Sequence, residues 1–365
     1  MSAATALTKA PVATPELAAD AVRIALDKAG IAHPHAVLLY LSADFAHDPV
    51  PALRAAARAA NCLQIAGCTA SGLFTEDEWV LDTPAAAALV LGDPFRLQAA
   101  CPDAPVLTLA APNALDWNWL AGGGERYGGV SGDATGQGPY SVWHMGRIQP
   151  QGRCELALTG GHARIGVAHG VRPLSLPALL TAARAHDLLA IAGQPALSDL
   201  VRALPLGTRS PDRIPLHLLM LGVTYGRLDQ ALEEGRYHLL PVLASNPNTG
   251  AVTVAGEVAR GSHVFWALRQ PQAAEYEMRS LIDRLSSDRL DEPQFALMFP
   301  CMGRGPAFYN GEDRDIVQFT RRFPDTPLIG FYGNGEIAHL DGANRLLQYS
   351  TVLALFYETP QSPAV

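Results

Sequence analysis

Hydrophobic and polar positions along the chain predict short buried strands that alternate with amphipathic helices. Apolar residues recur at helical spacing over residues 15–30, and the segment ends on glycine, a common helix stop. Short continuous apolar runs, typical of buried strands, follow at residues 36–45 and 85–93. A helical pattern at residues 50–60 lies between them. The pattern predicts a mixed α/β fold whose sheets are flanked by helices.

The second half of the chain continues in the same manner. Residues 233–256 read as a hairpin that turns at Asn-Pro-Asn-Thr-Gly, and residues 273–288 as an amphipathic helix. A buried strand in "QFALMFPCMGRG" is then followed by a helix in "GEDRDIVQFTRRF" and by two further strands, "PLIGFY" and "STVLALFYE". These segments predict a second set of strands and helices much like the first.

The two sets have the same order of elements, which indicates an internal duplication. Each runs strand, helix, strand with a small-residue turn, strand, once over residues 36–93 and again over residues 295–358. Gly67 then falls opposite Gly330, and Gly72 opposite Gly335. Open α/β sheets usually bind ligands at the carboxyl ends of their strands. We therefore expect both turns to leave backbone N–H groups free for a ligand.

A glycine-rich segment separates the two sets. Residues 122–138 contain eight glycines, and we expect no regular element there, because ordering glycine costs backbone entropy. One interpretation is a surface loop; the other is a lid whose bare amides approach a ligand. The segment has neither the P-loop ending nor the GxGxxG spacing.

Composition narrows the class of protein. Hydrophobic residues make up 48% of the chain and charged residues 17%, with a net charge of −8 and no Lys/Arg cluster. This excludes the concentrated positive charge that nucleic-acid and anionic-membrane surfaces need. The start, "MSAATALTKAPVATPE", reads as a short ragged leader and not as a signal peptide, and no apolar run is long enough to span a bilayer. We expect a cytoplasmic protein.

Cysteine and histidine spacing argues against a metal site. The five cysteines are scattered with no CxxC pair, and there is no HExxH motif. We expect no metal and no cofactor.

Two segments carry candidate chemistry. In "PCMGRG", Cys301 follows a buried strand and Arg304 is close by; a cation near a thiol favours the reactive thiolate. If the protein is an enzyme, Cys301 is its nucleophile and His339 its base; otherwise Cys301 is a packed core residue. Arg304 either forms an ion pair with Glu336 or Glu312, or holds a ligand carboxylate. Glu336 is a partner for a ligand amine, a structural acid, or a general base.

These segments resemble a known family. "PCMGRG", followed by "PLIGFYGNGEIAHL" and "LQYSTVLALF", is similar to the C-terminal module of the FIST family, and "IAGCTASG" and "GVAHGVRPLS" resemble its N-terminal module. The chain departs from the pattern at Leu73, where the family usually has an acid. The resemblance implies a two-module sensory protein that binds small ligands, amino acids being the usual suggestion. Without a fused signalling domain, it would report to a separate signalling protein.

We therefore expect an N-terminal extension and helix (1–35), a FIST N-like module (36–232), a FIST C-like module (233–358) and a tail (359–365). The preferred function is the binding of amino acids or similar polar metabolites for intracellular signalling, without catalysis. The alternatives are a cysteine-dependent amide or ester hydrolase and a protein-interaction scaffold. The expected ligand-binding residues are Cys301, Gly303, Arg304, Gly305, Gly330, Tyr332, Gly333, Asn334, Gly335, Glu336, Cys68, Thr69, Ser71 and Arg172.

Overall fold

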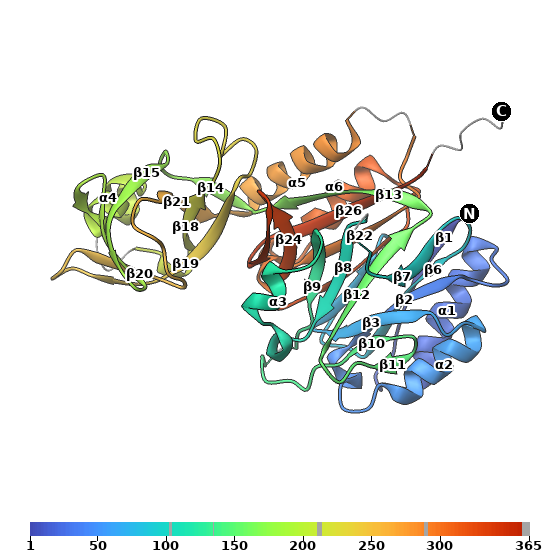
Figure 1. Cartoon of the computed structure of the whole chain (residues 1–365). Coiled ribbons are helices and arrows are strands. Elements are labelled where there is room, and N and C mark those ends of the chain that lie inside the picture. The colour runs from blue at the N-terminus through green and yellow to red at the C-terminus, as the bar shows by residue number, and fades with distance from the viewer. Residues whose placement is uncertain (102–103, 134, 210–213, 288–290, 360–365) are drawn as a thin grey trace. The chain divides into compact units, whose positions relative to one another are not determined.

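The computed structural model describes residues 1–101, 104–133, 135–209, 214–287 and 291–359 (Figure 1). Apart from residue 359, the predicted tail lies outside the described residues. The chain divides into two compact units, one made of Met1–Ala168 with Arg279–Val365, the other of His169–Met278. These units do not coincide with the predicted modules 36–232 and 233–358, because the second unit contains the end of one and the start of the other. The module boundaries therefore stay a prediction.

The first unit contains three copies of one strand arrangement, which we call repeats 1, 2 and 3. Repeat 1 comprises β1 (Ala3–Lys9), α1 (Pro15–Ala29), β2 (Ala36–Ser42), η1 (Ala43–Phe45), α2 (Val50–Ala60), β3 (Ile65–Ala70), β4 (Gly72–Thr75), β5 (Trp79–Leu81) and β6 (Ala85–Leu91). Repeat 2 comprises β7 (Arg96–Ala99), β8 (Val106–Ala110), η2 (Pro112–Ala114), α3 (Trp117–Ala121), β9 (Arg126–Val130), β10 (Val142–His144), β11 (Arg147–Ile148) and β12 (Arg153–Thr159). Repeat 3 comprises β13 (Gly161–Ala168), the end of α5 (Pro271–Ser286) from Arg279 onward, β22 (Phe295–Pro300), η6 (Met302–Arg304), α6 (Arg314–Arg322), β23 (Leu328–Tyr332), β24 (Glu336–Leu340), β25 (Ala343–Leu347) and β26 (Thr351–Glu358).

The three six-stranded sheets share one topology. Their orders are β1-β6-β2-β3-β10-β11, β7-β12-β8-β9-β24-β25 and β13-β26-β22-β23-β4-β5. In each sheet only the central pair is parallel: β2 with β3, β8 with β9, and β22 with β23. The last two strands of each sheet come from a different repeat, so β4–β5, β10–β11 and β24–β25 are exchanged in a cycle. The hypothesis of two related segments is confirmed, and repeat 2 is a third copy that the sequence pattern did not reveal.

One glycine in each repeat lets the parallel pair form. Gly67, Gly128 and Gly330 occupy the same register, and a Cβ at each would overlap the carbonyl oxygen of the neighbouring strand, at Leu39, Thr108 and Met298 respectively. The proposed equivalence of Gly67 and Gly330 is therefore correct. Its physical cause is close contact between backbones.

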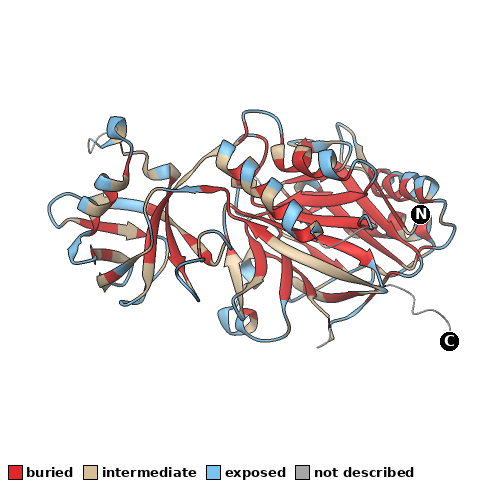
Figure 2. Cartoon of the chain, turned by 90° about the horizontal axis from the view of Figure 1, so that it is seen from above, coloured by how far each residue is buried: buried red, intermediate tan, exposed pale blue. Residues whose placement is uncertain are grey.

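The inner faces of the three sheets meet in a common core. Leu38 and Tyr40 of repeat 1, Leu107 of repeat 2 and Phe299 and Phe331 of repeat 3 are all buried in it. The opposite face of the first sheet is covered by α1 and α2, in line with the apolar spacing of these helices. Figure 2 shows the central strands of this unit as almost continuously buried, whereas β13 and β25 are mostly of intermediate burial.

Two expectations for this unit are wrong. The N-terminus is not a ragged leader, because Ala3–Lys9 forms β1 and pairs along its whole length with β6. The glycine-rich segment is not without regular structure, because Arg126–Val130 forms β9, between β8 and β24. Glycine is needed there because a Cβ at residue 129 would lie 2.7 Å from a ring carbon of Phe331 and 3.2 Å from one of Phe299.

The second unit is an antiparallel barrel inserted between β13 and α5. Its elements are β14 (Val171–Pro173), β15 (Ala178–Arg184), β16 (Asp187–Ile191), β17 (Gln194–Pro195), α4 (Ala196–Ala203), η3 (Leu206–Thr208), η5 (Leu216–Leu218), β18 (Leu219–Thr224), β19 (Tyr237–Asn246), β20 (Ala251–Val254) and β21 (His263–Arg269). The strands β21, β15, β16, β20, β19 and β18 form a closed ring, since β18 pairs with both β19 and β21. The predicted hairpin is confirmed as β19–β20.

Candidate functional site

Glu336 lies at the centre of the candidate site, at the carboxyl ends of β22 and β23. An isolated parallel bridge between Cys301 and Gly333 extends this strand pair by one step. Glu336 begins β24 and is fully buried. Its Oε2 accepts hydrogen bonds from the Ser350 N–H, at 3.1 Å, and from the Ser350 hydroxyl.

The environment of Glu336 favours its protonated form. Burial raises the pKa of the carboxyl to about 8, although hydrogen bonds from Ser350 and Cys301 and the charge of Arg304 act in the opposite direction. The Cys301 thiol is therefore a direct neighbour of the Glu336 carboxyl. Cys301 itself is 8% exposed, and it is the edge of this buried cluster.

Arg304 is a structural cation whose guanidinium is already occupied. It is 1% exposed, and its Nε and Nη2 donate to the two oxygens of Asp315 at 2.8 and 3.1 Å, while Nη1 donates to the Ala168 carbonyl at 2.7 Å. The structure pairs Arg304 with Asp315, a partner that the sequence analysis did not name. Asp315 is the partner because it lies in the first turn of α6, where a carboxylate is also stabilised by the helix dipole.

Asp313 adds a third buried carboxylate to the cluster. As the N-cap of α6 it accepts from the N–H groups of Asp315 and Ile316, and the Tyr332 hydroxyl donates to it at 2.5 Å. Burial, with the nearby charge of Asp315, raises the pKa of Asp313 to about 7. Asp315 also accepts from the hydroxyls of Tyr309 and Thr351, at 2.7 and 2.8 Å. Tyr332 thus serves the network, and the cluster holds three carboxylates against one guanidinium.

Equivalent positions in the other repeats lack this polar group. Strand register places Glu336 opposite Gly129, Leu73 opposite Phe331 and Val142 opposite Cys68. Gly129, Phe331 and Cys68 are equivalent, because each directly follows the equivalent glycine of its repeat, at residue 128, 330 or 67. Glu336 therefore occupies the place that apolar side chains take in the other two sheets. By the same register, the counterparts of Ser350 are Ala85 and Gly152, those of Cys301 are Ser42 and Ala111, and those of Arg304 are Phe45 and Ala114.

The three strand ends after β3, β9 and β23 meet next to this cluster. Ser71, Gly132 and Asn334 are equivalent residues. Each lies four positions after the glycine that lets the parallel pair form, at residue 67, 128 or 330. A Cβ on Gly132 would lie 2.9 Å from Ser71 Oγ and 3.0 Å from Asn334 Oδ1. Ser71 and Asn334 are partly exposed, and Ser71 Oγ has no hydrogen-bond partner among the described residues.

The turn amides are less available than expected. Gly333 N–H donates to the Pro300 carbonyl at 3.1 Å and Asn334 N–H to the Val130 carbonyl at 3.0 Å. The expectation of free amides is wrong for these two residues, because Gly333 continues the pairing of β23 with β22 and Asn334 is bonded to the end of β9. Thr69 is likewise engaged: its carbonyl accepts from the Ser131 hydroxyl at 2.6 Å.

The other expected site residues are dispersed. Gly303 lies in η6, Gly305 follows η6, Gly330 lies inside β23, and Gly335 precedes β24 with φ of +154°. Cys68 is in the core, where burial raises the pKa of its thiol well above the ordinary value. Arg172 is on β14 of the barrel unit.

The expected pairing of Cys301 with His339 is wrong. His339 lies three residues after Glu336 on β24, and strand alternation turns the two side chains to opposite faces. His339 Nδ1 is 3.0 Å from Asn344 Oδ1, and Nε2 is 3.9 Å from Glu125. The signal missed in the sequence is the pair Asp313 and Asp315 at the start of α6, which supplies the partners of Tyr332 and Arg304.

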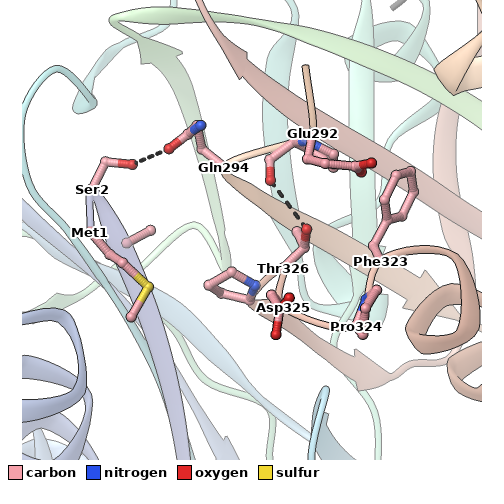
Figure 3. A pocket seen from close by; sticks show the side chains of 11 residues that line it. Met1, Ser2, Glu292, Gln294, Phe323, Pro324, Asp325 and Thr326 are labelled. Carbon is pink, nitrogen blue, oxygen red and sulfur yellow. Dashed lines mark hydrogen bonds between the residues drawn. The ribbon is translucent and has the colours of Figure 1, made fainter. Parts of the chain in front are cut away.

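A pocket that the sequence did not indicate lies at the opposite ends of the same strands. It encloses about 340 Å³ and is lined by Met1–Ala3, by the residues just before β22 and by those just before β23 (Figure 3). Ser2 Oγ donates to Gln294 at 2.8 Å across it. No group of metal-ligating side chains occurs among the described residues. In the same part of the chain no helix is long and apolar enough to cross a membrane.

A family model matches residues 196–339, which include Cys301, Arg304 and Glu336. It is the FIST C domain. The resemblance to the FIST family is thus confirmed for this part of the chain, and the match indicates a sensory signal-transduction domain. The FIST N-like assignment of the earlier residues lies mostly outside the match and stays a prediction.

Similar proteins occur in bacteria and in mammals. An uncharacterized protein of Mycobacterium tuberculosis is 27% identical over 233 residues, which are 63% of this chain and 60% of that protein. An uncharacterized protein of Mycobacterium bovis is 26% identical over the same shares. F-box only protein 22 of Homo sapiens is 28% identical over 138 residues, 36% of this chain and 33% of the human protein. The chain therefore spans about 60% of the mycobacterial relatives it matches.

Proposed function

We propose that this chain is a FIST-type sensory protein that binds a small polar metabolite, such as an amino acid, at the Cys301–Glu336 site. It would act inside the cell and pass the signal to a separate protein. The observation that carries the proposal is the contrast between the repeats. Three sheets of one topology form in the same chain, and only repeat 3 places a buried carboxylate where the others have Leu73 and Val142.

Burying a carboxylate costs free energy that an apolar side chain does not. Since repeats 1 and 2 fold with apolar residues at this position, the fold does not require Glu336. Perturbed carboxyl groups gather at functional sites more often than elsewhere. The same site adjoins the meeting point of Ser71, Gly132 and Asn334, of which Ser71 and Asn334 are partly exposed. This arrangement supports a ligand site with a buried acidic end and a partly exposed polar rim.

The test is thermal unfolding against a panel of amino acids and related small metabolites. A ligand that binds only the folded protein raises Tm in a saturable way. We expect the shift to be lost in Gly132→Ala, which adds a methyl group between Ser71 and Asn334 while removing no polar atom. Gly207→Ala is the matched control, because a Cβ at residue 207 meets open space. A shift that survives Gly132→Ala unchanged would place the ligand elsewhere.

A second candidate function is hydrolysis of an amide or ester. The contact between the Cys301 thiol and Glu336 favours it. The thiol would add to the substrate carbonyl and give its proton to ionised Glu336, which would pass it to the leaving group; water would then release the acid from the thioester. Turnover that vanishes in Cys301→Ala and rises as the pH increases through about 8 would support this route, whereas a fully active Cys301→Ala would exclude it.

A further inference from the structure

We infer that the ligand is a primary amine recognised through its ammonium group by Glu336, and that its carboxylate, where it has one, is not recognised by Arg304. This inference rests on the proposed function and specifies its chemistry. Three observations carry it: how the donors of the site are used, its charge balance, and the state of one carboxylate oxygen.

The donors around Glu336 and Arg304 are committed to internal partners, whereas the Ser71 hydroxyl at the rim of the site has none among the described residues. Arg304 is held by Asp315 and Ala168, Ser350 donates twice to Glu336, and the hydroxyls of Tyr309, Tyr332 and Thr351 donate to aspartates. The backbone N–H groups of Cys301, Met302, Gly333 and Asn334 donate to carbonyl oxygens. A ligand carboxylate would have to break one of these bonds and to enter a cluster already rich in carboxylates.

The charge balance favours a cation. Asp313, Asp315 and Glu336 together carry three negative charges when ionised, and Arg304 supplies one positive charge. Buried charge without compensation is costly, so the cluster either keeps protons or takes up a cation. The groups that face Glu336 are Ser350, the Cys301 thiol and Arg304, and burial still outweighs them in setting its pKa.

One oxygen of Glu336 is the place for the cation. Oε1 is buried and has no hydrogen-bond partner among the described residues, and the carboxyl group also has the Cys301 thiol, a weak donor, as a neighbour. Cys301 is 8% exposed and Asn334 is partly exposed, so we expect a ligand to reach Oε1 from their side. An ammonium brings three donors, and the partly exposed Asn334, two residues before Glu336, carries a further side-chain oxygen that can accept from one of them.

Binding in this mode releases a proton. At pH 7 the Glu336 carboxyl is mainly protonated in the free protein, since its pKa is raised to about 8. The ligand arrives as an ammonium and stays one, the carboxyl ionises, and its proton goes to the buffer. We expect close to one proton released for each ligand bound at pH 7, because the ion pair needs the ionised carboxylate.

The experiment compares matched derivatives of each amino acid. Amino-acid amides keep the α-ammonium and lack the carboxylate; N-acetyl amino acids keep the carboxylate and lack the ammonium. We would titrate wild-type protein with both sets by calorimetry at pH 7, in two buffers of different ionisation enthalpy. The expected result is binding of amides with proton release, and at least tenfold weaker binding of the N-acetyl set.

The variants locate the effect. In Glu336→Gln, which keeps the size and the Ser350 contacts, amide affinity should fall at least tenfold and proton release should disappear. Glu312→Gln, an exposed neighbour, should leave both unchanged. If Glu336→Gln does not fold, the wild-type comparison of the two derivative sets decides by itself.

Other results overturn the inference. Binding of the N-acetyl set with no binding of amides, equal binding of both sets, or amide binding without proton release would each refute ammonium recognition by Glu336 and leave the proposed function standing. If neither derivative set binds, and free amino acids and simple primary amines such as ethanolamine and putrescine do not bind either, both the proposed amino-acid site and the inference are refuted.

Discussion

Replacing Glu336 with glutamine should make the protein more stable at high pH. In the folded protein, burial raises the pKa of this carboxyl from 4.5 to about 8. A folded-state pKa above the unfolded value means that the native state binds the proton more tightly. The stability that this group contributes is therefore fully present below pH 4.5 and is lost as the pH rises through about 8.

The size of the effect follows from the same interval. At about 1.4 kcal/mol for each pH unit, the interval between 4.5 and about 8 corresponds to a loss of up to about 5 kcal/mol in the free energy of unfolding. The glutamine side chain of the variant cannot ionise, so the variant escapes this loss. We expect the two proteins to be similar near pH 4.5 and the variant to lead by several kcal/mol at pH 8.5.

Urea denaturation at pH 5, 6, 7, 8 and 9 measures the difference. All other titrating groups are common to both proteins, so they cancel to first order. Glu312→Gln is the control, because this side chain is exposed and its charge is solvated in both states. A difference between Glu336→Gln and wild type that stays constant with pH, or that grows as the pH falls, would refute the argument.

Three further predictions test the fold. Gly67→Ala, Gly128→Ala and Gly330→Ala should each lower the free energy of unfolding, measured by urea denaturation, by at least about 1–3 kcal/mol, because the new Cβ overlaps a strand carbonyl. The control Gly207→Ala should change it by no more than about 0.5 kcal/mol. Equal effects at all four sites would contradict the shared register. Arg304→Met should lower the free energy of unfolding by about 3–5 kcal/mol by leaving Asp315 unpaired, and adding Asp315→Leu should recover much of that loss; no recovery in the double variant would argue against the ion pair as the cause. Deleting residues 1–9 should lower Tm by about 2 °C or more, because β1 pairs along its full length with β6; an unchanged Tm would mean that the strand does not contribute.

The local pattern of apolar and polar residues was sufficient to predict those strands and helices whose own sequence shows the expected spacing. The buried strands β2, β6 and β22 are continuous apolar runs, and α1 and α2 show helical spacing with Gly30 and Asn61 in left-handed C-caps. The equivalence of Gly67 and Gly330 was also readable, since both follow a strand and a helix at matching distances. Such features depend on residues near one another in sequence.

Repeat 2 could not be recognised from the sequence, because its residues are determined by contacts with other parts of the fold and not by local secondary-structure preference. Its helix α3 has five residues, and its strand β9 reads Arg-Tyr-Gly-Gly-Val, a poor strand sequence by propensity. The glycines are there because Thr108 and Phe331 come too close for a side chain. That crowding exists only once three sheets have assembled around the common core.

The sequence by itself determined the class of fold, the position of Cys301 and Glu336 at strand ends, and the resemblance to the FIST family. Tertiary structure alone decided which partners these residues have. Glu336 contacts Ser350 and Cys301, and Arg304 is paired with Asp315. Ser71 and Asn334 both lie next to Gly132. The hairpin of each repeat pairs with the sheet of another repeat, which brings residues of different repeats together. Local periodicity fixes which face of a strand is buried, but the choice of neighbouring strand depends on the edges left open by the rest of the chain.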